Sequence, residues 1–374
     1  MSDVVAGLKD ILVKGIKDGV APGMACAVGD AEQTWFAEAG RFTYNAKSPA
    51  VNEKTLWDVA SLTKIVATTS VAMALYQEHV LDLDAHVQSV VAEFVGDDKD
   101  DVTVRNLLLH DSGLSAYLDL KKHTNALAAK DEILRSALRA VPCTRTDYSC
   151  LGFITLMELM QRLTGLGMDE LVRKYVTAPL GMSDTFYKPG LEDRSRCAPT
   201  EKYEPWRKEL EDLRGFKRVH ETYVQGVVHD PIAFVIGGIS GNAGLFSTSR
   251  DLARIARAWM GAAAPRGTSA SRGTAPKSPF AAEVVTLFSH KQEEKSTRGL
   301  GFDTRAEEDA SAGTKFSMRS FGHTGYTGTT IWVDPESQIF AVLLTNRVHP
   351  TAANMKIRDF RPAFHDAVFG LLTA

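Results

Sequence analysis

The chain of 374 residues contains few cysteines and no long apolar run. Since a membrane-spanning helix needs about 20 consecutive apolar residues, we expect no membrane partner. The N-terminal residues include early acids and lack an apolar segment of signal-peptide length, which predicts a cytoplasmic protein. We expect free thiols and no metal site, because the cysteines lack paired zinc spacing. They are Cys26, Cys143, Cys150 and Cys197.

A strong charge of either sign is also lacking, since the formal net charge is −3. Proteins that bind nucleic acid usually carry a basic patch, so no nucleic-acid partner is expected. The glycine-rich segment 237–244 lacks the Gly-Lys-Ser/Thr ending of a phosphate-binding loop. We therefore expect no nucleotide and no other cofactor.

Several catalytic motifs are missing as well. No Gly-x-Ser-x-Gly segment occurs, which argues against an α/β-hydrolase. His220-Glu221 lacks the second histidine of a zinc-protease helix. The segment 110–113, His-Asp-Ser-Gly, is not a catalytic triad, because successive side chains cannot face one another. We interpret it as the end of a helix with a glycine cap.

The segment 57–64, Trp-Asp-Val-Ala-Ser-Leu-Thr-Lys, ends in Ser-x-x-Lys and continues into apolar residues at helical spacing. Residues three apart on a helix share a face, so Lys64 can reach the Ser61 hydroxyl. A buried lysine with a lowered pKa can take the hydroxyl proton and activate the serine as a nucleophile. Alone, the motif is more typical of an N-cap serine followed by a solvated lysine.

Two further segments support the catalytic interpretation. Tyr148-Ser149-Cys150 precedes an apolar segment with helical spacing. His323-Thr324-Gly325 leads into two strand-like runs at 329–333 and 338–344, joined by an Asp-Pro turn. The sequence thus offers a serine, a lysine, a tyrosine and a histidine in three separate motifs.

In order and spacing, these motifs resemble the three active-site elements of the serine β-lactamase and penicillin-binding-protein superfamily. The likeness is greatest to the class C-like branch, which includes β-lactamase-related serine hydrolases and family VIII carboxylesterases. Other segments also resemble that family, and they are Pro22-Gly23-Met24, 107–114, 179–182, Val228-His229-Asp230 and 241–248.

The resemblance implies an α+β fold of the β-lactamase/transpeptidase type, with an antiparallel sheet flanked by terminal helices plus an all-helical part. Hydrophobic periodicity agrees with this, since it predicts strands near both ends of the chain around a helical middle. We expect one catalytic domain over 1–374, with the α/β part at roughly 1–60 and 245–374 and the helical part at roughly 61–244. The Pro/Gly/Ser-rich stretch 261–279 is expected to be a flexible loop.

Periodicity and capping signals also locate individual elements. They predict helices at about 3–18, from 61 to about 79, after Thr103, at 131–140, after Tyr148, at 168–177, at about 249–260 and at 355–372. Strands are predicted at 24–28 and 34–39, with a turn at Gly29-Asp30.

The resemblance also assigns roles. Ser61 is expected to form an acyl-enzyme while Lys64 and Tyr148 shuttle the proton. The oxyanion hole is expected to consist of the backbone N–H groups of Ser61 and Tyr326. Substrate contacts are expected from Cys150, His323, Thr324 and Gly325.

Two positions depart from the family pattern and bear on the substrate. Cys150 stands where asparagine or aspartate is common, and it is a poor partner for an amide side chain. His323 stands where lysine is usual, so a carboxylate anchor would lose its charge above about pH 6.5. Both departures favour a small ester over a β-lactam.

The expected partner is therefore a small-molecule ester, amide or lactam, with esterase-like activity favoured. A D-specific peptidase or transpeptidase, or a true β-lactamase, is the first alternative. A non-catalytic scaffold or filament-forming relative is the second. The oligomeric state is left open by the sequence.

Overall fold

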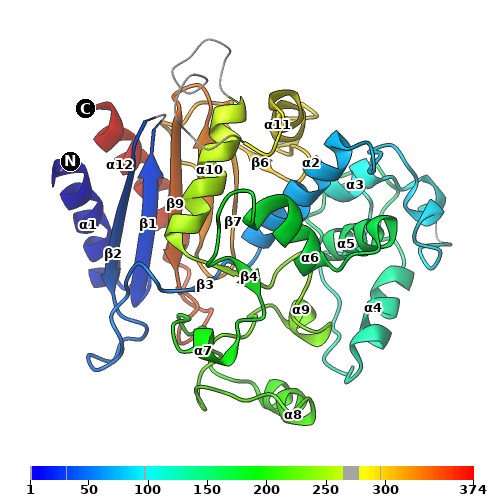
Figure 1. The fold of residues 1–374 in the computed structure, drawn as a ribbon, viewed down its shortest axis with the longest axis horizontal. Helices are drawn as coiled ribbons and strands as arrows, with labels where there is room; N and C mark the ends of the chain where they lie inside the picture. The colour runs from blue at the N-terminus through cyan, green and yellow to red at the C-terminus, as the bar shows by residue number, and fades with distance from the viewer. Residues whose placement is uncertain (1, 31, 97, 264–277, 295) are drawn as a thin grey trace.

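The structure, a computed structural model, describes residues 2–30, 32–96, 98–263, 278–294 and 296–374 (Figure 1). Within them, the largest sheet is antiparallel with strand order β2-β1-β9-β8-β7-β6. Strand β1 pairs with β9, so both ends of the chain contribute to one sheet, as predicted. The strands are β1 (Gly23–Gly29), β2 (Thr34–Gly40), β6 (Asp303–Thr304), β7 (Phe321–Thr324), β8 (Thr330–Asp334) and β9 (Ile339–Thr345).

Helices cover both faces of this sheet (Figure 1). Along β1, Met24, Cys26 and Val28 face one core, whereas Ala25 and Ala27 face the other. This period-2 alternation is what a strand buried on both faces requires. The first core includes residues of α1 (Ser2–Lys17) and α12 (Ile357–Thr373), and the second includes residues of α10 (Ser249–Ala263) and α11 (Ala282–Ser289).

A helical region lies beside the sheet and continues the second core (Figure 1). A small sheet of order β3-β5-β4 joins three distant parts of the chain, and β3 ends three residues before Ser61. Its strands are β3 (Trp57–Asp58), β4 (Phe186–Tyr187) and β5 (Leu245–Ser247). The helices are η1 (Lys64–Thr69), α2 (Ser70–Gln77), η2 (Val87–Ser89), η3 (Lys99–Asp101), α3 (Val104–Leu109), α4 (Ala126–Arg135), α5 (Cys150–Thr164), α6 (Met168–Val172), η4 (Arg173–Thr177), α7 (Leu191–Arg194), α8 (Pro205–Leu213) and α9 (Pro231–Val235).

Most predicted elements are confirmed, but four differ. The helix predicted at 168–177 is an α-helix only as far as Val172 and continues as the π-helix η4. The helix predicted at 131–140 occupies Ala126–Arg135, because the Asn125 side chain accepts the N–H of Leu127 at 2.8 Å and caps the helix earlier. The stretch after Ser61 is not one regular α-helix, since η1 is a π-helix. Residues 261–263 of the predicted loop belong to α10, and 264–277 lie outside the described residues.

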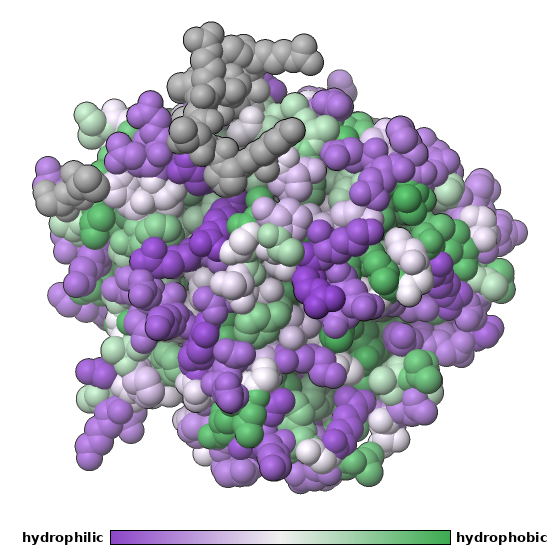
Figure 2. Space-filling view, in the orientation of Figure 1, coloured by the Kyte–Doolittle hydropathy of each residue, from purple (hydrophilic) through white to green (hydrophobic). Residues whose placement is uncertain are grey.

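None of the helices in the described part of the chain is long and apolar enough to span a bilayer. All four cysteines are free thiols. Space-filling atoms show polar and apolar side chains intermixed over the face seen in Figure 2.

Candidate active site

Ser61 follows β3 in a tight turn that the local sequence stabilises. Ala60 has a positive φ of 49°, which is uncommon for a residue other than glycine. The buried Asp58 carboxylate accepts the Ala60 N–H at 2.8 Å and the His229 N–H at 2.6 Å. These two bonds fix the turn that presents Ser61.

Lys64 lies in a buried position directly behind Ser61. Its Nζ is 3.3 Å from Ser61 Oγ, and it donates to the Asn242 carbonyl at 3.0 Å. Lys64 Nζ also lies 3.6 Å from Cys150 Sγ and 4.8 Å from the centre of the Tyr148 ring. The predicted contact between serine and lysine is therefore present.

The pKa expected for Lys64 was wrong in direction. Burial lowers the pKa, but the neighbouring Cys150 and Tyr148 raise it by more, so the pKa lies above its ordinary value. Lys64 thus keeps its proton at neutral pH. Its ammonium group therefore lies as a cation next to Ser61, Cys150 and Tyr148.

Tyr148 lines the same cavity as Ser61. Burial raises the pKa of its phenol, while the Lys64 charge and hydrogen bonds with Lys64 and Ser61 oppose that rise. The guanidinium carbon of Arg298 lies 5.5 Å from the centre of the ring. Tyr148 therefore contacts both members of the Ser-x-x-Lys motif and lies near two cations.

The hairpin of β7 and β8 packs tightly against the turn before Ser61. Thr329 Oγ1 donates to the Val59 carbonyl at 3.0 Å. A side chain at Gly325 would place its Cβ 2.6 Å from that same oxygen, so only glycine fits. Among the described residues, the N–H groups of Ser61 and Tyr326 have no hydrogen-bond acceptor. Both amides remain available to a substrate oxygen.

His323 is buried, and it loses its charge at a lower pH than the sequence alone predicted. Burial lowers its pKa to about 4, so the ring is neutral at physiological pH. Its Nδ1 lies 2.6 Å from the Thr324 carbonyl, which can only accept, so Nδ1 carries the hydrogen. The imidazole packs 5.7 Å from the Tyr148 ring.

Positive charge in the cavity comes instead from arginines that the sequence reasoning missed. The cavity measures about 350 Å³ and is lined by four arginines. Among the described residues that line it, the sole carboxylate is that of Asp303, which pairs with Arg298. The other three arginines that line the cavity are Arg347, Arg358 and Arg361.

These arginines are held in different ways. Arg361 is partly buried and donates to the Gly325 carbonyl at 2.5 Å, and burial lowers its pKa to about 9. Arg347 donates from Nε to the Tyr326 carbonyl at 2.7 Å. The Arg358 side chain is exposed, and it has no hydrogen-bond or ion-pair partner in the described part of the chain. Arg358 and Arg361 lie three residues apart on α12, a spacing that places both on one face.

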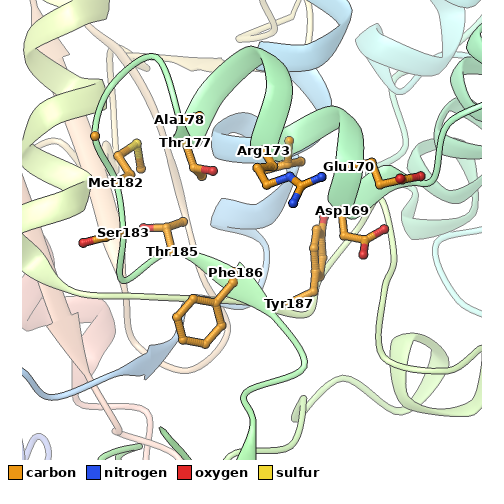
Figure 3. Close-up of a pocket in the computed structure, with 12 residues that line it drawn as sticks. Asp169, Glu170, Arg173, Thr177, Ala178, Met182, Ser183, Thr185, Phe186 and Tyr187 are labelled. Carbon is orange, nitrogen blue, oxygen red and sulfur yellow. The ribbon is translucent and has the colours of Figure 1, made fainter.

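A larger cavity, of about 780 Å³, lies elsewhere, between the α6–η4 helices and β4 (Figure 3). Asp169, Glu170 and Arg173 approach it from the helices, and Ser183 and Tyr187 from the opposite side. No lysine, histidine or cysteine is among the described residues that line it. We therefore place the candidate active site at the other cavity, where Ser61 and Tyr148 lie next to Lys64.

A family model named Beta-lactamase matches residues 8–362. The chain belongs to the β-lactamase family. An Escherichia coli (strain K12) protein named "Putative D-alanyl-D-alanine carboxypeptidase" is 28% identical over 325 residues, which are 80% of this chain and 71% of that protein.

Solved structures share the fold of this β-lactamase-family chain. A penicillin-binding-protein homologue from Caulobacter crescentus has a TM-score of 0.73 and 19% identity, covering 99% of this chain and 98% of that one. A class C β-lactamase from Rhodobacter sphaeroides has a TM-score of 0.72 and 16% identity, covering 98% and 99%. These likenesses confirm the predicted α+β, β-lactamase/transpeptidase-like fold.

The structure brings the predicted site residues of this β-lactamase relative around one cavity. Ser61 and Tyr148 line it together with four residues of the β7–β8 region, and Lys64 and Cys150 lie behind them. The four are His323, Thr324, Gly325 and Tyr326. The spacing of Arg358 and Arg361 was the sequence signal that could have identified the missing cations.

Proposed function

We propose that the protein is a serine hydrolase that forms an acyl-enzyme at Ser61 on small esters or amides whose leaving group carries a carboxylate. The observation that carries this proposal is the cavity itself. In it, Ser61 and Tyr148 share a space of about 350 Å³ with guanidinium groups that outnumber the carboxylates.

In the first step, Ser61 Oγ attacks the substrate carbonyl carbon and its proton passes to Tyr148 Oη. Tyr148 accepts the proton in its phenolate form, which the adjacent Lys64 ammonium stabilises. The negative oxygen of the tetrahedral intermediate accepts hydrogen bonds from the free N–H groups of Ser61 and Tyr326. One such donor contributes about 3 kcal/mol.

Collapse of the intermediate breaks the bond to the leaving group, which takes the proton from Tyr148. Water then attacks the acyl-enzyme and gives a proton to the same phenolate, and Ser61 recovers its proton as the acid is released. Every proton that enters the Tyr148–Lys64 pair leaves it again. The cycle therefore needs neither a metal ion nor a cofactor.

The substrate class follows from the arginines. A guanidinium group binds a carboxylate through charge-assisted and often bidentate hydrogen bonds. Arg358 is exposed and available, while Arg347 and Arg361 support the hairpin next to Ser61. A carboxylate on the leaving-group side of the substrate would occupy this part of the cavity.

The ester preference depends on Cys150. Its Sγ lies 3.6 Å from Lys64 Nζ, and a thiol offers only weak hydrogen bonds to an acylamino group. A simple acyl group needs no such contact. Esters also release a better leaving group than amides, so we propose ester hydrolysis with slow or no β-lactam turnover.

A second candidate is a D-specific carboxypeptidase. The arginine cavity suits the terminal carboxylate of a peptide, and the Escherichia coli relative carries a carboxypeptidase name. A non-catalytic scaffold has less support, because Lys64 is buried 3.3 Å from a partly exposed serine and a buried ammonium without function is costly.

Matched substrates test the proposal. We expect 3-carboxyphenyl butyrate to be cleaved with a kcat/KM about tenfold or more above that of phenyl butyrate. A D-alanyl-D-alanine dipeptide with an acylated N-terminus serves as the second candidate's substrate. Equal rates for the two esters would exclude the carboxylate pocket, and faster cleavage of the dipeptide would replace the ester assignment by the peptidase.

A further inference from the structure

His110 belongs to the segment that the sequence suggested to be only the end of a helix. It terminates α3, and His110 itself, with a φ of 60°, is the left-handed residue that ends the helix. Such a conformation is uncommon for residues other than glycine. His110 is also almost completely buried, with 1% of its surface exposed.

His110 binds the chain on both sides of Tyr148. Its carbonyl accepts the Asp147 N–H at 2.8 Å, and its ring Nδ1 accepts the Ser149 N–H at 2.9 Å. A backbone N–H only donates, so Nδ1 bears the lone pair and Nε2 the hydrogen. One residue thus holds the backbone amides immediately before and after the tyrosine.

The His110 ring also contacts the Tyr148 side chain. The two ring centres are 4.7 Å apart, and the Phe153 ring stacks on the histidine at 5.0 Å. Burial and the nearby Arg298 and Lys64 charges lower the pKa of His110 well below its ordinary value, so the ring stays neutral and keeps Nδ1 as an acceptor.

We propose that His110 is the positioning residue for Tyr148, holding the phenol between Ser61 and Lys64 through the Nδ1 bond to the Ser149 N–H. This inference rests on the proposed function, since it assumes that Tyr148 transfers the Ser61 proton. It adds a residue that acts through another and does not touch the substrate. A displacement of about 1 Å in a catalytic group can cost about 100-fold in rate.

The test compares His110→Asn with His110→Gly. Asparagine and glycine both tolerate a positive φ, so neither variant strains the backbone. Asparagine Oδ1 occupies the place of Nδ1 and can still accept the Ser149 N–H, whereas glycine offers no acceptor. We expect kcat of His110→Asn to stay within about threefold of the wild type and kcat of His110→Gly to fall at least about tenfold, with KM little changed.

Two further readouts separate positioning from a loss of stability. In His110→Gly, the acidic limb of the kcat/KM profile is expected to move to higher pH, because a phenol farther from Lys64 has a higher pKa. In a Tyr148→Phe background, His110→Gly is expected to cost little more activity. Thermal denaturation gives the melting temperature of each variant, and the assays are run below that temperature so that every variant is folded.

His79 provides the matched control. It also follows a helix with a positive φ, of 58°, but it is exposed at the end of α2. His79→Gly and His79→Asn should both retain wild-type kcat. Equal losses in His110→Asn and His110→Gly, or full additivity with Tyr148→Phe, would overturn the inference. Absence of Ser61-dependent turnover in the wild type would instead refute the proposed function.

Discussion

The cavity at Ser61 and the larger cavity between the α6–η4 helices and β4 differ more in chemistry than in size. The larger, of about 780 Å³, combines Asp169, Glu170 and Arg173, and its described lining lacks lysine, histidine and cysteine (Figure 3). The smaller, of about 350 Å³, combines Ser61 and Tyr148 with four arginines. Volume alone would have selected the larger cavity and not the one that we propose as the active site.

The difference shows what makes a site reactive. A serine becomes a nucleophile only next to a group that takes its proton, and a carboxylate substrate is held only where cations exceed anions. The smaller cavity meets both conditions, because the Tyr148 phenol hydrogen-bonds with Ser61 and arginines outnumber carboxylates among the described lining residues. Substitutions of matched residues in the two cavities should therefore have unequal effects.

The largest contrast is expected between two serines. Ser61→Ala should lower the turnover of 3-carboxyphenyl butyrate at least about a thousandfold, because the nucleophile is lost. Ser183→Ala, in the larger cavity, should change turnover by less than about twofold. Steady-state kinetics with both purified variants measures this, and a large loss in Ser183→Ala would reverse our choice of cavity.

The next effect concerns the proton relay. Lys64→Ala and Tyr148→Phe should each lower kcat about 100-fold, since the ammonium stabilises the phenolate that accepts the Ser61 proton. The double variant should lose far less than the product of the two losses. If the two losses multiply, Lys64 and Tyr148 act independently and the relay is wrong.

A smaller effect is expected at Arg358. Arg358→Ala should raise KM for 3-carboxyphenyl butyrate about tenfold, because a charge-assisted bond is lost, and leave phenyl butyrate unaffected. Arg173→Ala, in the larger cavity, is the matched control and should alter neither substrate. Equal loss on both esters would show that Arg358 supports the fold and not the carboxylate.

The smallest effect is expected in the ratio of the cleavage rates of 3-carboxyphenyl butyrate and phenyl butyrate, which should change little with pH. Both esters should be cleaved faster as pH rises, because burial raises the pKa of Tyr148 and only its phenolate reacts. Their rate ratio should change by less than about twofold between pH 6 and 8, since guanidinium groups stay charged there. The pKa of Arg361, about 9, lies above this range, and that of His323, about 4, below it. A rate ratio that rises steeply as the pH falls to 6 would show that protonated His323, and not an arginine, binds the substrate carboxylate.

The sequence was sufficient to predict the contacts of the candidate site that depend on local geometry. Ser61 and Lys64 meet because they are three positions apart in the chain, and the short apolar run at 24–28 predicted strand β1. The early start of α4 was missed because the Asn125 cap was overlooked.

The remaining errors have a different origin. The pKa of His323 lies below the value of about 6.5 expected from the sequence because the ring is buried, and no local motif reveals that burial. Arg358 and Arg361 reach the cavity only because α12 packs beside the sheet that carries β7, a strand formed by an earlier part of the chain. His110 was underestimated because its partners, Asp147 and Ser149, lie across a loop.

The most direct test of the central claim is covalent labelling of the folded protein with a fluorophosphonate, followed by peptide mapping with mass spectrometry. We expect one adduct per chain, located on Ser61, and slower labelling in Tyr148→Phe because the proton acceptor is missing. An adduct on any other residue of a protein that cleaves 3-carboxyphenyl butyrate would contradict the assignment of Ser61 as the nucleophile.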